Sequence, residues 1–141
     1  MTAEQDPTGA VCDLAQSKCE PCRGGIPPMD RATADTYLVQ VPGWSIAGDP
    51  DHLVRTFRFD DFRAAQAFAV RVGNLCEDEG HHAEIIHGWG YCTVKFWTHK
   101  IGGLHENDFI MAAKVDGLHG APYVPASASM GDVSPTARDV G

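Results

Sequence analysis

Two adjacent histidines and a third one further along the chain suit acid–base chemistry: His81, His82 and His99. Imidazole titrates near neutral pH, so one ring can give a proton while another takes one. Neighbouring residues direct their side chains differently, so the adjacent pair can contact two parts of one ligand. Glu77 stands four residues before His81, where its carboxylate can orient that ring if a helix continues so far. These residues predict general acid–base catalysis on a small molecule.

Two further polar residues join this candidate set. Thr98 directly precedes His99 at the end of an alternating segment, and Asp108 stands in the first turn of a predicted final helix. Catalytic groups are commonly displayed where a strand ends beside a loop. If the two predicted hairpins pair, the start of the third strand lies beside the end of the fourth, which brings His82 and His99 to one edge of the sheet.

The same residues fit two plainer interpretations. An adjacent histidine pair is often a polar loop, and Glu77 and Asp108 are typical of a solvated helix end and of a helix start. Histidines and carboxylates are also metal ligands, but the H-x-x-x-H and H-E-x-x-H patterns are missing, so we expect no metal site. His87, His105 and His119 have no evident partner and are predicted to lie on the surface.

The bulk composition limits the class of protein. The chain has 141 residues, enough for one domain, and a formal net charge of −8 with only 11 Lys and Arg. Such a charge disfavours nucleic acid and anionic membranes as partners. No apolar run is long enough to span a bilayer, and the N-terminus lacks the features of a secretory signal. We therefore expect a soluble, cytoplasmic protein whose 5 cysteines are reduced.

The central part of the chain alternates between helical and extended patterns. Apolar residues recur at helical spacing after Asp30, after Asp60 or Asp61, and from Glu106 to Val115. Alternating segments over residues 44–46, 52–59, 83–87 and 91–98 predict strands in two hairpins. The order helix, strand, strand, helix, strand, strand, helix indicates an α+β fold, with helices packed on one face of a four-stranded antiparallel sheet.

The other face of that sheet needs a cover. Val54, Thr56 and Cys92 are predicted to form an apolar strip on this face. A second copy of the chain would cover the strip, so the pattern favours a homo-oligomer.

Both ends of the chain lack a periodic apolar pattern. We predict a flexible N-terminal leader over residues 1–25, a folded domain over residues 26–118 and a flexible tail over residues 119–141. The leader carries a C-x-x-C pair, Cys19 and Cys22, with Cys12 nearby. Half a zinc site and a redox pair are alternatives to a reduced, unstructured segment, which we favour because no second C-x-x-C follows.

The candidate residues belong to one longer string with fixed spacing. Its members are Glu77, His81, His82, Trp89, Thr98-His99, Gly103-Leu104 and Glu106-Asn107-Asp108-Phe109. In order and spacing this string resembles the signature of the pterin-4a-carbinolamine dehydratases of the bacterial type. The resemblance extends upstream through Pro42-Gly43-Trp44 and residues 57–62, so it covers nearly all of the predicted domain.

The resemblance implies the α+β sheet derived above and a reaction that needs no cofactor. That reaction removes water from a 4a-hydroxytetrahydropterin and gives the quinonoid dihydropterin that a reductase recycles for aromatic amino acid hydroxylases. A homodimer or homotetramer is also implied. The implied catalytic residues are His81, His82 and His99, and the implied substrate-binding residues are Glu77, Trp89, Thr98 and Asp108.

The implied chemistry suits these residue types. Protonating the departing 4a-hydroxyl needs an acid and removing the N5 proton needs a base, and both atoms lie on one ring edge. We expect His81 and His99 to act as proton donor and acceptor. We expect His82 to hold the pterin and Glu77 to tune His81.

Two residues depart from the family pattern. Ala83 replaces the proline that usually follows the histidine pair and that would fix φ. His105 stands where a serine commonly caps the last helix, so we expect a weaker helix start.

Two other functions are alternatives to the dehydratase. Family relatives include proteins that stabilise transcription-factor dimers or assist the assembly of other enzymes, so a dimerisation or assembly role through the sheet or helix surface is the runner-up. The three retained histidines argue against a degenerate relative. The third function is a metal-binding regulatory module built on Cys12, Cys19, Cys22 and nearby histidines.

Overall fold

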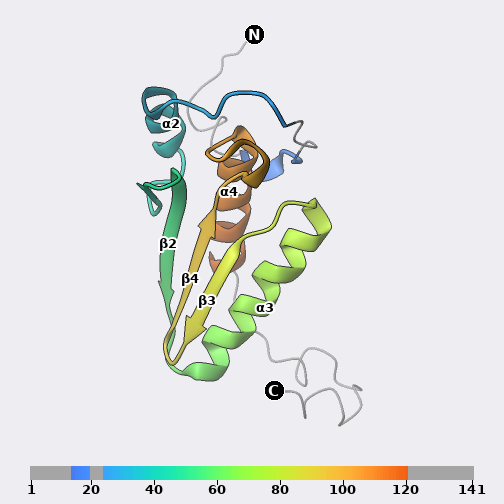
Figure 1. Cartoon of the computed structure of the whole chain (residues 1–141). Coiled ribbons are helices and arrows are strands. Elements are labelled where there is room, and N and C mark those ends of the chain that lie inside the picture. The colour runs from blue at the N-terminus through green and yellow to red at the C-terminus, as the bar shows by residue number, and fades with distance from the viewer. Residues whose placement is uncertain (1–13, 20–23, 121–141) are drawn as a thin grey trace.

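The computed structural model describes residues 14–19 and 24–120 and has one antiparallel sheet with helices against it (Figure 1). After a helical turn at residues 14–16 come α2 (Arg31–Leu38), β1 (Ser45–Ala47), β2 (His52–Arg58), α3 (Phe62–Glu79), β3 (Glu84–Gly88), β4 (Tyr91–Phe96), the 3-10 turn η1 (His99–Ile101) and α4 (Glu106–Gly120). The strands lie in the order β1-β2-β4-β3. The predicted α+β class is confirmed, and η1 is an addition to the predicted order. No helix within the described ranges has the length and apolarity to cross a membrane.

Alternation along the two central strands builds the core. Phe57 of β2 lies opposite Cys92 of β4, Leu53 lies opposite Phe96, and all four side chains are buried. α3 packs on β3 and β4, and α4 packs on β2 and β4. The expectation that Cys92 lies on the uncovered face with Thr56 is wrong. Residues that lie directly opposite each other share a face, so Cys92 faces the core together with Phe57.

α3 is the helix that leads into the histidine pair. Its first turn is capped by the Asp61 carboxylate, which accepts from the Ala64 N–H at 2.8 Å. The helix ends at Gly80, whose φ of 67° lies in the left-handed region that glycine adopts without strain. The His81 N–H closes this end on the Cys76 carbonyl at 3.1 Å. The chain therefore leaves the helix just before the two histidines.

α4 begins with a reciprocal cap. The Asn107 N–H donates to Nδ1 of His105 at 3.0 Å, and the His105 N–H donates to the Asp108 carboxylate at 2.9 Å. This exchange satisfies two N–H groups that a helix start leaves without partners. His105 thus caps the helix, because its Nδ1 accepts where a serine oxygen would. Whether this start is weaker than one with serine stays a prediction. α4 also continues to Gly120, past the expected end at Val115.

The middle of α4 is tied to the sheet through one partly buried carboxylate. Oδ1 of Asp116 accepts from Nε1 of Trp44 and from the Arg55 guanidinium, each at 2.8 Å. The guanidinium also lies over the Phe57 ring, 4.5 Å from its centroid. Burial raises the pKa of the Asp116 carboxyl, although the hydrogen bonds and the Arg55 charge act in the opposite direction. The segment before β1, β2 and α4 meet at this contact.

Part of the predicted leader lies against the two long helices. Leu14 is buried in the core, and Lys114 of α4 donates to the Ala15 carbonyl at 2.7 Å. The Cys19 N–H donates to Glu79 of α3 at 3.2 Å, and Lys114 lies 3.6 Å from the same carboxylate. Residues 14–19 therefore bridge the end of α3 and the middle of α4.

The predicted C-x-x-C pair falls only partly within the described residues. The Cys19 thiol donates to the Asn107 carbonyl at 3.8 Å, and burial raises the pKa of this thiol to about 12. Cys12 and Cys22 lie outside the described residues. A zinc or redox role for this pair stays untested.

Candidate active site

One buried carboxylate joins three segments at the end of the sheet. Asp108 of α4 has no exposed surface, and its Oδ1 lies 2.7 Å from Nε2 of His81. Its Oδ2 accepts from the Thr98 hydroxyl at 2.8 Å and from the His105 N–H at 2.9 Å. An ionised carboxylate only accepts hydrogen bonds, so these donors satisfy it in the interior. The loop after α3, the segment after β4 and the start of α4 are held together here.

One ring nitrogen of His81 forms a hydrogen bond within the protein. Its side chain is 11% exposed, and its ring stacks on Phe96 with 6.2 Å between the centroids. Because Nε2 donates to Asp108 and Nδ1 has no hydrogen-bond partner among the described residues, Nδ1 is the nitrogen open to a ligand. In the neutral ring Nδ1 accepts a proton, and in the charged ring it donates one. A ring held in this way can accept or donate a proton, which is the step that general acid–base catalysis requires.

His82 has a carboxylate partner of its own. Its Nε2 lies 2.6 Å from Oε2 of Glu77, and both side chains are exposed, 59% for His82 and 76% for Glu77. The expected contact between Glu77 and His81 is wrong. The left-handed turn at Gly80 takes both histidines off the helix, so that His81 faces the core and His82 lies beside the last helical turn.

His99 is placed by an aromatic contact. β4 ends at Phe96, so His99 begins η1 and does not stand at a strand end as expected. Its ring packs against Trp97 with 4.5 Å between the centroids, and Trp97 packs in turn against His52 at 5.7 Å. Since His99 is exposed, this contact orients the imidazole and leaves it open to a ligand.

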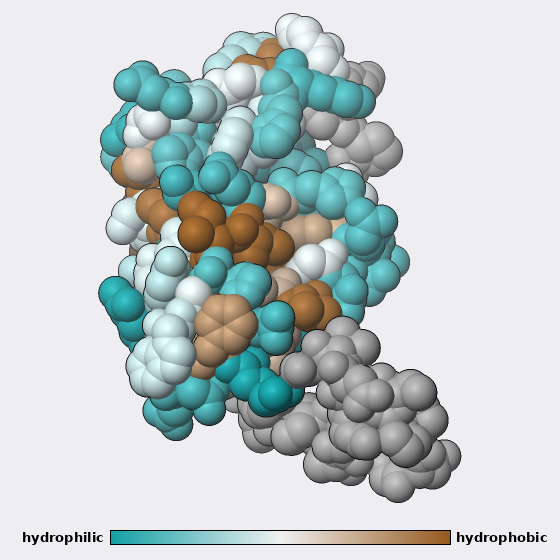
Figure 2. All heavy atoms as spheres, turned by 60° about the horizontal axis from the view of Figure 1, so that its bottom comes forward, coloured by the Kyte–Doolittle hydropathy of each residue, from teal (hydrophilic) through white to brown (hydrophobic). Residues whose placement is uncertain are grey.

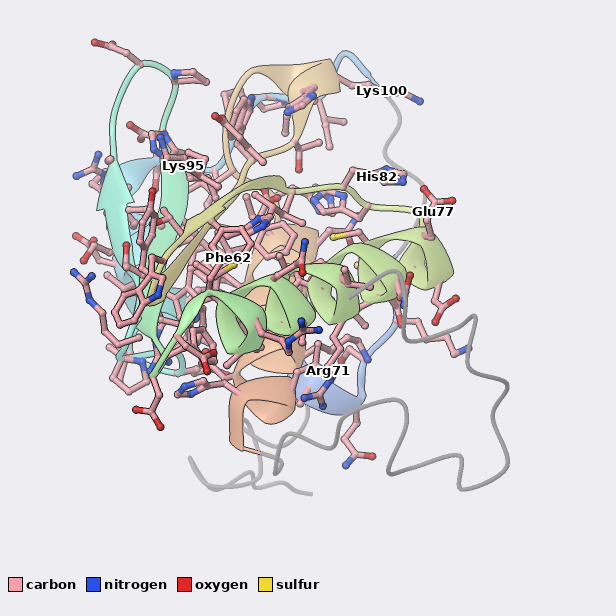
Figure 3. The ribbon with its side chains drawn as sticks, turned by 90° about the horizontal axis from the view of Figure 1, so that it is seen from below. Phe62, Arg71, Glu77, His82, Lys95 and Lys100 are labelled. Atoms are coloured by element: carbon pink, nitrogen blue, oxygen red, sulfur yellow. The ribbon has the colours of Figure 1, made fainter. Side chains whose placement is uncertain are left out.

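The strand register brings the histidines to one end of the sheet. Glu84 at the start of β3 lies opposite Lys95 near the end of β4. The segments that carry His82 and His99 therefore leave the sheet as neighbours. Figure 3 shows His82 and Lys100, the residue after His99, at this same end of the molecule.

Trp89 does not lie with the other candidate residues. It stands at the tip of the β3–β4 hairpin, next to Gly90 with its φ of 85°, and is 70% exposed. The 5 residues of β3 separate this tip from the histidine pair, a length of roughly 17 Å. Within one copy of the chain, Trp89 is too far from His82 to share a small ligand with it.

Each carboxylate of the site contacts one histidine of the pair. Glu77 faces His82 and Asp108 faces His81. Among residues 14–19 and 24–120, no group of three or more His, Cys, Asp or Glu side chains is arranged to hold a metal ion. The two histidine–carboxylate pairs supply groups that can transfer protons.

Residues 27–118 match the family model described as Pterin 4 alpha carbinolamine dehydratase. The chain belongs to the pterin-4a-carbinolamine dehydratase family. Two similar family members, from Methylococcus capsulatus and an Azoarcus species, are provisionally named pterin-4-alpha-carbinolamine dehydratase. The first is 58% identical over 108 residues, 77% of this chain and 95% of the relative. The second is 52% identical over 108 residues, 77% of this chain and 92% of the relative.

The fold of this dehydratase family member is also similar to that of a solved structure. The transcriptional coactivator/pterin dehydratase from Brucella melitensis superposes with a TM-score of 0.62 at 26% identity. The similarity covers 66% of this chain and 99% of the Brucella chain. The family resemblance indicated by the spaced string is thus confirmed.

Two contacts in the candidate site of this pterin dehydratase family member were not predicted from the sequence. The His105 N–H binds Asp108, and the signal for it is a cap residue followed three positions later by an acid. Trp97 packs on His99, and the local signal for this contact is an aromatic residue two positions earlier in the sequence. Each contact orients one of the candidate residues, Asp108 in the first case and His99 in the second.

Proposed function

We propose that this protein dehydrates a 4a-hydroxytetrahydropterin to the quinonoid dihydropterin without a cofactor. An acid donates a proton to the departing 4a-hydroxyl, the C4a–O bond breaks, and a base removes the N5 proton, so that water leaves. The pterin exchanges no electrons with another molecule. The observation that carries the proposal is the buried His81–Asp108 pair, 2.7 Å long, in a chain of this family.

His81 and His99 are the proposed acid and base. The two reacting atoms lie on one edge of the pterin ring, so imidazoles at one end of the sheet can serve both. Asp108 orients His81 in place of Glu77, and Thr98 acts through Asp108 as a positioning residue. His82, held by Glu77 at the exposed side of the site, binds the pterin.

The quinonoid product needs reduction before it can serve again as a tetrahydropterin. The proposed setting is therefore pterin recycling in the cytoplasm, beside a reductase and an aromatic amino acid hydroxylase that generates the 4a-hydroxy compound. The net charge of −8 suits a small neutral ligand better than nucleic acid.

Stopped-flow measurement of dehydration tests the proposal. His81→Ala and His99→Ala should each lower turnover by about 10²-fold or more with little change in pterin affinity. His82→Ala should raise KM more than it lowers kcat. His87→Ala is the matched control, because His87 lies on β3 against Phe62, and it should keep wild-type turnover. Wild-type turnover in both the His81 and His99 variants would contradict the assignment.

A binding role is the second candidate, favoured by apolar surface on α3. Phe62 and Val70 are 43% and 56% exposed, and in Figure 2 apolar side chains gather on the side that comes forward. The similar Brucella protein is described as a coactivator as well as a dehydratase. If wild type does not accelerate the dehydration, this role becomes the better account of the fold.

A further inference from the structure

A short segment before α2 contacts both helices that carry the His81–Asp108 pair or lead into it. The segment of residues 14–19 begins with a helical turn, in which the Ser17 N–H donates to the Leu14 carbonyl at 3.1 Å. Figure 1 shows this segment in blue, between α4 and the end of α3. The segment precedes residues 27–118, the part of the chain that matches the family model. The family match therefore does not account for it.

Lys114 of α4 joins this segment to the end of α3. Its Nζ donates to the Ala15 carbonyl at 2.7 Å and lies 3.6 Å from Oε2 of Glu79. The other oxygen of Glu79 accepts from the Cys19 N–H at 3.2 Å. The Lys114 and Glu79 side chains are only 16% and 17% exposed. Because a largely buried charge is costly without its partner, these contacts hold the three pieces of chain together.

Cys19 lies between the two parts of the chain that the buried histidine–carboxylate pair joins. Glu79, which accepts from its N–H, stands two residues before His81. Asn107, whose carbonyl accepts from its thiol at 3.8 Å, directly precedes Asp108. Burial raises the pKa of this thiol to about 12, and the Glu79 charge acts in the same direction. At neutral pH the group is therefore a thiol that donates and not a thiolate nucleophile.

We propose that the segment of residues 14–19 positions His81 against Asp108. The inference rests on the proposed function, in which His81 transfers a proton. Gly80 alone separates Glu79 from His81, so a shift of the last turn of α3 moves the imidazole with it. A misplacement of about 1 Å can lower a catalysed rate by about 100-fold. The contacts of the segment fix the end of α3 relative to α4 and thereby the place of the ring.

The kinetics of Lys114→Ala test the positioning role. This variant loses the donor to Ala15 and the charge beside Glu79, so kcat should fall by about 10-fold or more while KM changes little. Lys114→Arg keeps a charged donor and should restore most of kcat. Lys18→Ala, which changes an exposed lysine of the same segment, is the matched control and should behave as wild type. A wild-type kcat in Lys114→Ala would overturn the proposal.

A second control separates positioning from a general loosening of α4. Trp44→Phe removes one hydrogen bond from Asp116, which stands two residues after Lys114 on the same helix. Trp44→Phe and Lys114→Ala should both lower the midpoint of urea unfolding, but only Lys114→Ala should lower kcat. An equal loss of kcat in Trp44→Phe would mean that loosening of the helix explains both results, and the proposal would fail.

Exchanging the two charges separates the segment from the ion pair between the helices. A chain with both Glu79→Lys and Lys114→Glu can form the ion pair again in the opposite sense. The new carboxylate would face the Ala15 carbonyl and the new ammonium would face the Cys19 N–H, so both hydrogen bonds to the segment are lost. The exchanged variant should therefore be as impaired in kcat as Lys114→Ala. Full recovery would show that the segment has no positioning role.

NMR of the histidine ring nitrogens tests the inference without catalysis. At alkaline pH the neutral His81 ring of wild type should be one tautomer, protonated at Nε2, because this nitrogen donates to Asp108. In Lys114→Ala the ring should exchange between both tautomers. His87, which packs on Phe62 at the other end of α3, is the internal reference. If wild type does not dehydrate the pterin, these signals alone decide the inference. Unchanged His81 signals would overturn it even in an active enzyme.

Discussion

Two histidine–carboxylate pairs of nearly equal length stand in different surroundings. In the 2.7 Å pair the Asp108 side chain is 0% and His81 is 11% exposed, whereas in the 2.6 Å pair Glu77 is 76% and His82 is 59% exposed. An exposed pair competes with water and adds little to stability. A buried carboxylate that loses a donor is left with an unsatisfied charge in the interior. Replacing the carboxylate by an amide should therefore affect activity unequally in the two pairs.

Asp108→Asn should reduce turnover by at least about 10²-fold. An amide in this position presents an N–H where the ring of His81 or the hydroxyl of Thr98 now donates, so the imidazole loses its fixed orientation. Steady-state dehydration is the measurement, with thermal unfolding as a check on folding. Glu106→Gln, an exposed acid in the same helical turn, is the control and should retain activity. A nearly wild-type Asp108→Asn enzyme would refute the orienting role.

Glu77→Gln should have a smaller effect. The amide oxygen still accepts from Nε2 of His82, and water can replace the lost charge at this exposed position. We expect kcat to stay within about 10-fold of wild type and the change to fall mainly on KM. Asp78→Asn changes the neighbouring acid and serves as the control. A loss as large as that of Asp108→Asn would show that exposure does not separate the two pairs.

At the scale of the element, the glycine within α3, Gly73, and the glycine that ends it, Gly80, have opposite requirements. An added Cβ would meet nothing within 4 Å at either position, but Gly80 has a φ of 67° and Gly73 lies in regular helix. Gly73→Ala should therefore raise the free energy of unfolding by about 0.5–1 kcal/mol. Gly80→Ala should lower it by about 1–2 kcal/mol and should also reduce turnover, because the turn aims the histidine pair. Urea unfolding of both variants checks the opposite signs.

The elements could be predicted from the sequence because their apolar periods are local, but their ends depend on distant residues. Asp61 marks the start of α3 by its own side chain. The end of β4 at Phe96 follows from the pairing of Thr98 with Gly103 across η1. The extension of α4 past Val115 follows from contacts that Asp116 makes with segments more than sixty residues away. No local pattern reports such contacts.

The members of the candidate site could also be predicted, but not their partners. Residue types and spacing selected His81, His82 and Asp108. Which carboxylate meets which histidine depends on a single left-handed residue, Gly80, and helical spacing assigned Glu77 to the wrong ring. The distance of Trp89 from the histidines depends on strand direction and pairing, which the spaced string does not contain.

At the scale of the whole molecule, Asp116 links stability to pH. Burial raises the pKa of its carboxyl, so the folded state holds this proton more tightly than the unfolded state does. Stability from this group is fully present below the unfolded pKa and is lost as pH rises through the folded pKa. The Asp116→Asn variant has no carboxyl group at this position, so its stability does not decline with pH for this reason. The free energy of unfolding of wild type minus that of the variant should therefore fall as the pH rises from about 3 to about 7.

Chemical denaturation at a series of pH values measures this difference. Asp35→Asn changes an exposed aspartate on α2 and is the matched control. Its free energy of unfolding should change with pH in the same way as that of wild type. A difference between wild type and Asp116→Asn that grows with pH would mean that the Arg55 charge outweighs burial.

Three segments of the chain meet at Asp108, and this has a consequence for the stage of folding at which the site forms. Its side-chain donors come from positions 27 and 10 residues earlier in the chain. A hairpin or a helix that forms by itself therefore contains no functional part of the site. The proposed catalytic site is complete only when the loop after α3, the end of the sheet and α4 have docked together. Nascent or partly folded chains should therefore not catalyse the proposed dehydration.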